Sequence, residues 1–229
     1  MKRRFIIAID GPAGSGKSTT AREVAKRLGF LYIDSGAIYR AITLEILKKG
    51  INIEDTQKVK QIVENTKIEV ESSVHGFRLM VNGEDVTEAI RSPQVSAQVS
   101  LVSENAYVRE MITQKQRDMA DDLSVVVEGR DIGTVVFPDA DLKIYMDASV
   151  EERAQRRFKE LRAKGYEVTL KDIMQDITSR DARDSSRALS PLKKAEDAIL
   201  IDTTHLNFEQ QVDLIVQLYL DYQKKKKKT

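Results

Sequence analysis

The sequence predicts an α/β protein with a five-stranded parallel sheet flanked by helices, and three observations lead to that prediction. Short apolar runs recur along the 229 residues with helical stretches between them, which is the pattern of a parallel sheet covered on both faces. The first run leads into a glycine-rich loop and then a helix. Residues 67–86 change to period-two alternation and predict a small antiparallel insert.

Five apolar runs are the expected strands of the core sheet, at residues 4–9, 30–33, 124–128, 142–146 and 198–201. The helices between them carry start and stop signals. Gly29 ends the helix expected over residues 18–28, and Ser92 with Pro93 opens another. Ser149 and Glu152 have the spacing of a capping box, and the last helix is expected over residues 208–222.

The insert is expected to hold about three strands, because Asn82-Gly83 is the turn dipeptide of a tight hairpin. Pattern alone leaves two interpretations open. The insert either decorates the core or, because ligands bind at the carboxyl ends of parallel strands, forms a wall of a substrate cleft.

Composition restricts the class of protein without assigning a function. The chain has no cysteine, which excludes disulfides and thiolate metal sites and fits a cytoplasmic protein. No apolar run approaches the ~20 residues of a membrane span, so we expect no membrane segment. The 37 basic and 36 acidic side chains nearly cancel, so no overall field attracts nucleic acid. Lys224 to Lys228 are expected to form a solvated, frayed tail, with weak, sequence-blind contacts to nucleic acid or an anionic surface as the alternative.

The glycine-rich loop carries the clearest chemical signal. Residues 11–18 match the pattern G-x-x-x-x-G-K-S, in which backbone N–H groups and a helix N-terminus hold a polyphosphate. Lys17 would reach the outer phosphates, and the Ser18 hydroxyl would ligate Mg2+. A plain surface loop is the alternative.

Charged residues at two strand ends are further candidates. Residues 34–40 follow the second strand, where Arg40 could grip a phosphate or be a solvated surface charge. Residues 128–131 end the third strand and favour a ligand-facing loop, because a buried strand exposes charge only at its tip.

Two arginine clusters have helical spacing, and spacing alone does not separate an anion site from ion pairs. One comprises Arg153, Arg156 and Arg157; the other comprises Arg180, Arg183 and Arg187, with Asp184 as an ion-pair partner for Arg180. His75 and His205 have no partner at catalytic or metal-binding spacing and are expected to be structural or exposed.

Taken in order, residues 11–19, 34–40, 128–138 and 180–187 resemble the bacterial type of cytidylate kinase over nearly the whole chain. The resemblance implies a P-loop kinase fold and phosphoryl transfer from ATP to CMP or dCMP, with Mg2+. It also implies a core of residues 1–35 and 100–229, a mobile helical lid over about 153–171, and a monophosphate-binding region at 36–99 that contains the insert. Small-molecule substrates are the expected partners, and we expect a monomer.

The resemblance also implies roles for individual residues. ATP would be held by Gly11, Pro12, Ala13, Gly14, Ser15, Gly16, Lys17, Ser18 and Thr19. The monophosphate would be held by Ser35, Arg40, Ser100, Arg109, Arg130, Asp131, Arg180, Asp184 and Arg187. The residues expected to act in catalysis are Lys17, Arg130, Asp131, Arg153 and Arg157. Another small acceptor (UMP, AMP or a non-nucleotide metabolite) is the alternative substrate, and an ATP-driven nucleic-acid module is the alternative class.

Overall fold

A computed structural model describes residues 4–73, 76–163 and 165–226, and the chain divides into two compact units. Unit 1 comprises Met1–Phe30 and Val125–Thr229, and unit 2 comprises Leu31–Ser124. This division reflects how the chain packs. The predicted monophosphate-binding region, residues 36–99, remains a prediction, because packing does not assign a binding role to a segment.

The main sheet confirms the predicted fold class. Its strands are β1 (Ile6–Asp10), β2 (Leu31–Asp34), β6 (Val125–Gly129), β7 (Leu142–Asp147) and β8 (Ile199–Asp202), in the order β2-β6-β1-β7-β8. The pairings of β1 with β6, β1 with β7, and β7 with β8 are all parallel. Every residue of β1 and β6 is buried, which explains why both appear in the sequence as continuous apolar runs.

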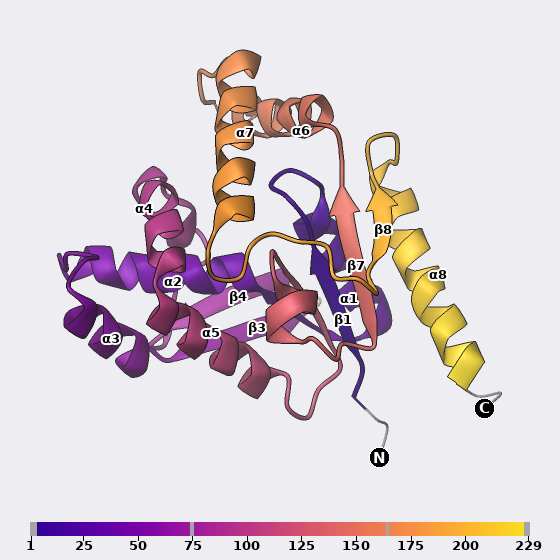
Figure 1. Cartoon of the computed structure of the whole chain (residues 1–229), viewed down its shortest axis with the longest axis horizontal. Helices are drawn as coiled ribbons and strands as arrows, with labels where there is room; N and C mark the ends of the chain where they lie inside the picture. Colours follow the sequence, from indigo (N-terminus) through magenta and orange to yellow (C-terminus); the bar gives the residue numbers. More distant parts are fainter. Residues whose placement is uncertain (1–3, 74–75, 164, 227–229) are drawn as a thin grey trace. The chain divides into compact units, whose positions relative to one another are not determined.

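The helices of unit 1 are α1 (Lys17–Leu28), α6 (Val150–Ala163), α7 (Leu170–Ser186), α8 (Phe208–Lys226) and the π-helical turn η2 (Ile132–Val136). Among them, α1 and α8 lie along this sheet, whereas α6 and α7 lie beyond the carboxyl end of β7 (Figure 1). Aromatic rings of Phe5 and Phe30 meet the ring of Tyr219 edge to face, at centroid distances of 5.0 and 5.5 Å. These contacts attach α8 to the start of β1 and the end of α1.

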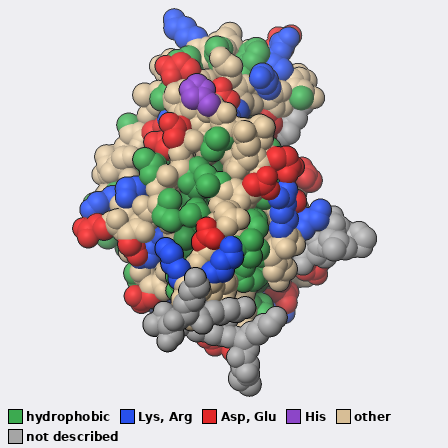
Figure 2. All heavy atoms as spheres, turned by 90° about the vertical axis from the view of Figure 1, so that its right-hand side faces the viewer, with side chains coloured by type: hydrophobic (Ala, Val, Ile, Leu, Met, Phe, Trp, Pro, Cys, Tyr) green, Lys and Arg blue, Asp and Glu red, His purple; other side chains and the backbone are tan. Residues whose placement is uncertain are grey.

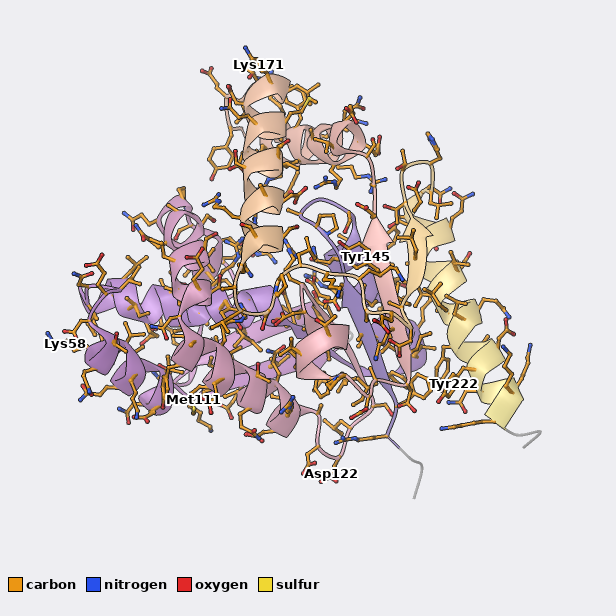
Figure 3. All side chains as sticks on the ribbon, viewed as in Figure 1. Lys58, Met111, Asp122, Tyr145, Lys171 and Tyr222 are labelled. Atoms are coloured by element: carbon orange, nitrogen blue, oxygen red, sulfur yellow. The ribbon has the colours of Figure 1, made fainter. Side chains whose placement is uncertain are left out.

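Helices α6 and α7 pack on each other around a small apolar core of their own. Ala154 of α6 and Ile173 and Ile177 of α7 are buried there. Lys171, near the start of α7, lies far from Tyr145 on β7 (Figure 3). The segment predicted to be a lid, residues 153–171, therefore packs against the part of α7 that lies beyond residue 171, and the lid itself remains a prediction.

Unit 2 contains the predicted antiparallel insert. Strands β3 (Ile68–Ser73), β4 (Gly76–Val81) and β5 (Glu84–Asp85) form a three-stranded sheet. Asn82 and Gly83 both have positive φ, 51° and 85°, as the predicted hairpin turn requires. His75 lies outside the described residues. The helices of this unit are α2 (Ser35–Lys48), α3 (Thr56–Asn65), the 3-10 turn η1 (Ala89–Arg91), α4 (Pro93–Glu104) and α5 (Ala106–Met119).

Two sequence predictions about helix ends are partly wrong. Ser149 caps α6 by accepting the Glu152 N–H at 3.2 Å, but the second half of the expected capping box is absent. The Ser149 N–H donates to the Thr204 hydroxyl, and the Glu152 carboxylate accepts from Arg156 instead. A long-range hydroxyl and an i,i+4 ion pair therefore replace the reciprocal contact.

The first three residues of the lysine run, Lys224 to Lys226, are helical rather than frayed. Helix α8 continues to Lys226, four residues beyond the predicted end, and the Lys226 ammonium lies 3.8 Å from the Asp141 carboxylate. Cations are favourable in the last turn of a helix because the helix dipole is negative there. Lys227 and Lys228 lie outside the described residues.

The face of unit 1 formed by α8 and β8 carries exposed apolar side chains (Figure 2). They include Ile199 and Leu200 on the edge strand and Leu214 and Leu220 on the helix. Within the described residues, no helix is both long and apolar enough to cross a membrane.

We predict that Gly11→Ala destabilises the protein more than Gly50→Ala. Both glycines have positive φ, but a Cβ on Gly11 would lie 2.0 Å from the backbone oxygen of Met146, whereas a Cβ on Gly50 meets no atom within 4 Å. The expected loss in free energy of unfolding is about 3 kcal/mol or more at Gly11 and about 1–2 kcal/mol at Gly50, measured by denaturant titration. Equal losses would contradict the steric account.

Candidate functional site

The glycine-rich loop has the predicted context, between the end of β1 and the start of α1. Lys17 is buried, and its ammonium donates to the Pro12 carbonyl at 3.0 Å, so it lies across the loop. The Thr19 hydroxyl donates to the Gly16 carbonyl at 2.9 Å. A cation and the N-terminus of a twelve-residue helix therefore share one loop, which favours a polyphosphate ligand.

Thr203 and Gln211, which the sequence analysis did not select, hold the loop and the start of α1 together with Arg156 of the first arginine cluster. The Thr203 hydroxyl, after β8, donates to the Ser15 carbonyl at 2.9 Å. Arg156 donates to the Thr203 carbonyl at 2.6 Å. Thr20 of α1 donates to the side-chain oxygen of Gln211 at 2.9 Å. A single threonine or glutamine carries no pattern in sequence, and the Thr203–Ser15 and Thr20–Gln211 contacts join residues 188 and 191 positions apart.

The first arginine cluster splits into two environments. The buried Arg153 guanidinium donates to the carbonyls of Ala148 and Ala13 at 2.9 and 3.0 Å and pairs with Asp181 at 2.6 Å. Arg157 is exposed and pairs with Glu160 at 2.8 Å. The two candidates from this helix therefore differ: Arg153 touches the glycine-rich loop, whereas Arg157 forms a surface ion pair.

Two members of the second arginine cluster converge on one carboxylate, whereas Arg183 donates to the Ser179 carbonyl at 3.4 Å instead. Asp184 has a side chain only 3% exposed, and its oxygens lie 2.9 Å from Arg130 Nε and 4.0 Å from Arg180 Nε, with a further hydrogen bond from Arg187. Three guanidinium groups therefore meet at one buried carboxylate. The expected pair of Arg180 and Asp184 exists, but it is the longest of the three.

The arginines also set the ionisation of Asp184. Burial alone would raise the pKa of this carboxyl, but the charges of Arg130, Arg187 and Arg180 outweigh burial and hold the pKa below 3.8. Asp184 is therefore an anion at neutral pH. It occupies the position among the arginines that suits an oxyanion.

The end of β6 differs in part from the predicted ligand-facing loop. Glu128 and Gly129 are the last two residues of the strand and are buried. Arg130 and Asp131 follow the strand, and the Asp131 side chain is buried too. Of residues 128–131, only Arg130 and Asp131 therefore lie beyond the end of the strand.

Asp10 was not among the residues selected from the sequence, but it contacts the segment that follows Asp131. Its two carboxylate oxygens accept the backbone N–H groups of Ile132 and Gly133, each at 2.8 Å. Burial raises the pKa of Asp10 to about 6, even though both backbone hydrogen bonds lower it. An acidic residue at a strand's carboxyl end was the available sequence signal.

The remaining candidates lie in unit 2, on three helices. Ser35 is the buried first residue of α2, and Arg40 of the same helix donates to the Ser96 hydroxyl of α4 at 2.9 Å. Ser100 lies one turn further along α4. Arg109 of α5 is buried, donates to the Ser103 carbonyl at 2.8 Å and lies over the ring of Tyr39. These helices pack on one another, so unit 2 gathers its own candidates.

The described residues contain no group of three or more His, Cys, Asp or Glu side chains arranged to hold a metal ion. Ser18, the second residue of α1, offers a hydroxyl oxygen beside the glycine-rich loop. This donor set fits Mg2+, which commonly takes few protein ligands and completes its coordination with substrate phosphates and water.

Comparison with known proteins gives a consistent result across the chain. The family model for cytidylate kinase matches residues 7–221. The chain is 49% identical over 212 residues to a cytidylate kinase of Carboxydothermus hydrogenoformans, covering 93% of this chain and 96% of the relative. It is 50% identical over 218 residues to a cytidylate kinase of a Geobacillus species, covering 95% and 97%.

A solved structure of an uncharacterised protein from Eubacterium ventriosum aligns with a TM-score of 0.53 at 14% identity, covering 95% of this chain and 99% of that one. At that identity the likeness supports the fold alone.

We predict that Asp184→Asn lowers the free energy of unfolding by about 1–3 kcal/mol at pH 7, because the arginines lose their counter-charge. Since the folded pKa of Asp184 lies below 3.8, its contribution is present above that pH and is lost as the pH falls further. Denaturant titrations at pH 7 and pH 3 measure both effects.

Asp197→Asn is the matched control. Asp197 also pairs with a cation, Lys143, but its side chain is 66% exposed and screened by solvent. The expected loss is below about 1 kcal/mol. Losses of the same size for the two variants at pH 7 would contradict the buried-cluster account.

Proposed function

The chain belongs to the cytidylate kinase family, and on that premise we propose that it transfers the terminal phosphoryl group of ATP to CMP or dCMP, forming ADP and CDP or dCDP. The observation that carries this proposal is the match of the family model over residues 7–221, which includes both the glycine-rich loop and the Asp184 cluster. No protein nucleophile is required, because the acceptor phosphate attacks the donor directly.

The site has a donor half, which binds ATP, and an acceptor half, which binds the monophosphate. In the donor half, residues 11–19 hold the phosphates of ATP. Their backbone N–H groups and the N-terminus of α1 face the phosphates, and Lys17 reaches the outer ones. Mg2+, held by the Ser18 hydroxyl, phosphates and water, would neutralise charge on the phosphates. The transferred group carries charge on its equatorial oxygens in the transition state, so alignment and charge neutralisation supply the catalysis.

In the acceptor half, the arginines around Asp184 hold the monophosphate. Arg130 and Arg187, with Arg40 of unit 2, clamp its oxygens and leave one in line for attack. The convergence of three guanidinium groups on Asp184 supports this role, because guanidinium groups are the usual bidentate ligands of a phosphate. We assign Asp184 and Arg180, with Ser35 and Ser100, to the remaining contacts with the nucleotide, Asp184 at the ribose hydroxyls.

Base selection depends on hydrogen-bond polarity. Cytosine offers an amino donor at N4 and an acceptor at N3, which suit the carboxylate of Asp131 and the guanidinium of Arg109. Uracil reverses both groups. Each mismatch would leave a buried polar group unpaired at a cost of about 1–3 kcal/mol, so CMP is preferred to UMP.

The lid supplies the exclusion of water. Residues from about 153 to 171 carry Arg153 and Arg157, and α6 and α7 share a separate apolar core. Closure of this body over bound ATP would exclude water and prevent unproductive hydrolysis. Arg157, in a surface ion pair, would exchange Glu160 for a phosphate oxygen on closure.

An ADP-release assay with CMP, dCMP, UMP, AMP and shikimate tests the substrate. Turnover on CMP should exceed turnover on UMP or AMP, and equal or greater turnover on either would reject the assignment in favour of another acceptor. Nucleic-acid-stimulated ATP hydrolysis that disappears on deleting residues 224–228 would instead support a nucleic-acid module. We further propose that the enzyme acts as a monomer in the cytoplasm.

Asp131→Asn is predicted to lower the CMP preference over UMP by about tenfold, because an amide can donate to uracil as well as accept from cytosine. The KM for ATP should stay nearly unchanged. Steady-state kinetics with both acceptors measure the ratio. An unaltered ratio would remove Asp131 from base recognition.

Lys17→Ala is predicted to abolish turnover with every acceptor, because the outer phosphates lose their cation. Lys26→Ala, an exposed lysine in the last turn of the same helix, is the matched control and should retain full activity. Measurable turnover in Lys17→Ala at saturating ATP would exclude an essential role for this ammonium.

A further inference from the structure

Asp10 occupies the carboxyl end of the central strand. In register, it lies opposite Gly129 of β6 and Tyr145 of β7, so strands flank it on both sides. The side chain is 4% exposed. The next residue, Gly11, begins the glycine-rich loop. Asp10 therefore lies where the glycine-rich loop and the segment after β6 both leave the sheet.

The carboxylate makes two hydrogen bonds to one short segment. Oδ1 accepts the N–H of Ile132 and Oδ2 accepts the N–H of Gly133, both at 2.8 Å. These N–H groups open the turn η2. A helical turn leaves its first N–H groups without partners inside the turn, and a side chain usually supplies the cap.

The capping arrangement is unusual because the cap comes from another strand. Asp131 holds the N-cap position of η2, and its side chain makes no capping hydrogen bond. An aspartate at that position would ordinarily cap its own helix. Asp10, 122 positions before Ile132, accepts these N–H groups instead. The Asp131 carboxylate therefore does not serve as the cap of η2.

We propose that Asp10 is a positioning residue for residues 130–133, which we name the acceptor loop: by fixing the backbone of Ile132 and Gly133, it aims Arg130 and Asp131 at the acceptor nucleotide. This inference rests on the acceptor roles proposed for Arg130 and Asp131. Asp10 itself touches neither nucleotide in this scheme. Its effect is on the acceptor half of the reaction.

Charged and titratable groups that follow β6 or lie on β7 surround Asp10. Burial is the main cause of the raised pKa of Asp10; the Asp131 charge raises it further and the Arg130 charge lowers it. Burial likewise raises the pKa of Tyr145 on β7, with smaller contributions from Asp147 and Asp10. The stem of Lys143 on β7 packs beside Gly133, with its ammonium paired to Asp197.

The pKa of Asp10 is raised to about 6, so the folded state binds a proton more readily than the unfolded chain. Ionisation of Asp10 therefore reduces stability as the pH rises from about 4 to 6. A buried charge kept at a cost in stability is typical of functional sites.

Two acceptor oxygens are required, and only a carboxylate supplies both. In Asp10→Asn the amide oxygen can accept one N–H group, while the NH2 group would face the other N–H. The acceptor loop would shift at one of its two anchor points. A misplacement of about 1 Å is sufficient to reduce a rate by about a hundredfold.

The test is steady-state kinetics of Asp10→Asn with ATP, CMP and UMP. We expect kcat/KM for CMP to fall by about ten- to a hundredfold and the CMP preference over UMP to fall with it, while the KM for ATP changes less than about threefold. Below pH 6 the wild type should lose activity more steeply than the variant. The ionisation of the CMP phosphate, also near pH 6, is common to both proteins.

Asp141→Asn is the matched control, because Asp141 is a nearly buried carboxylate that accepts the N–H of Ile6 at 3.1 Å, at the opposite end of β1. It should retain CMP selectivity and kcat/KM for CMP. An equal loss in both variants, or a loss shared by ATP and CMP, would mean a general effect on β1 and overturn the proposal.

A measurement on the wild-type protein covers the case in which Asp10→Asn does not fold. The amide proton resonances of Ile132 and Gly133 should shift together with a midpoint near pH 6 as Asp10 titrates. Absence of a shift between pH 4.5 and 8 would overturn the proposal. A loss of selectivity in Asp131→Asn but not in Asp10→Asn would overturn it too, with the proposed function intact. Unchanged selectivity in Asp131→Asn would instead reject the base-reading role.

Discussion

The carboxyl end of β1 is the constraint on which the rest of unit 1 depends. Asp10 fixes the backbone of η2, and Gly11, the next residue, begins the glycine-rich loop against the backbone of Met146. One buried strand end therefore positions both a polyphosphate-binding loop and the segment that carries Arg130 and Asp131. A shift of this strand would move both segments together, which in the proposed reaction would keep the donor and acceptor contacts in register.

Charge is concentrated in a chain that is almost neutral overall. The net charge is +1, yet three guanidinium groups meet one carboxylate at Asp184. Asp184 keeps these arginines close together in the absence of an anion, because a buried cluster of like charges without a counter-charge would be costly. In the proposed reaction this cluster accepts the monophosphate, so the arrangement that stabilises the fold also prepares the site.

The parts of the fold predicted from sequence are those with local causes. Buried parallel strands are continuous apolar runs, and Asn82-Gly83 permits the positive φ angles of a hairpin. The tertiary contacts could not be predicted. Asp10 lies more than 120 positions from its partners, and the turn η2 has no sequence signature. The helical spacing predicted an ion pair between Asp184 and Arg180. In the structure Arg130, which follows a strand distant in sequence, lies closer to the Asp184 carboxylate than Arg180 does.

Calorimetric titration of CMP into the protein saturated with a non-hydrolysable ATP analogue and Mg2+ tests the central claim most directly. The account predicts that CMP binds with a stoichiometry of one while the analogue stays bound, and that UMP binds at least about tenfold more weakly. Competition between CMP and the analogue for one site, or no heat from either ligand, would contradict it.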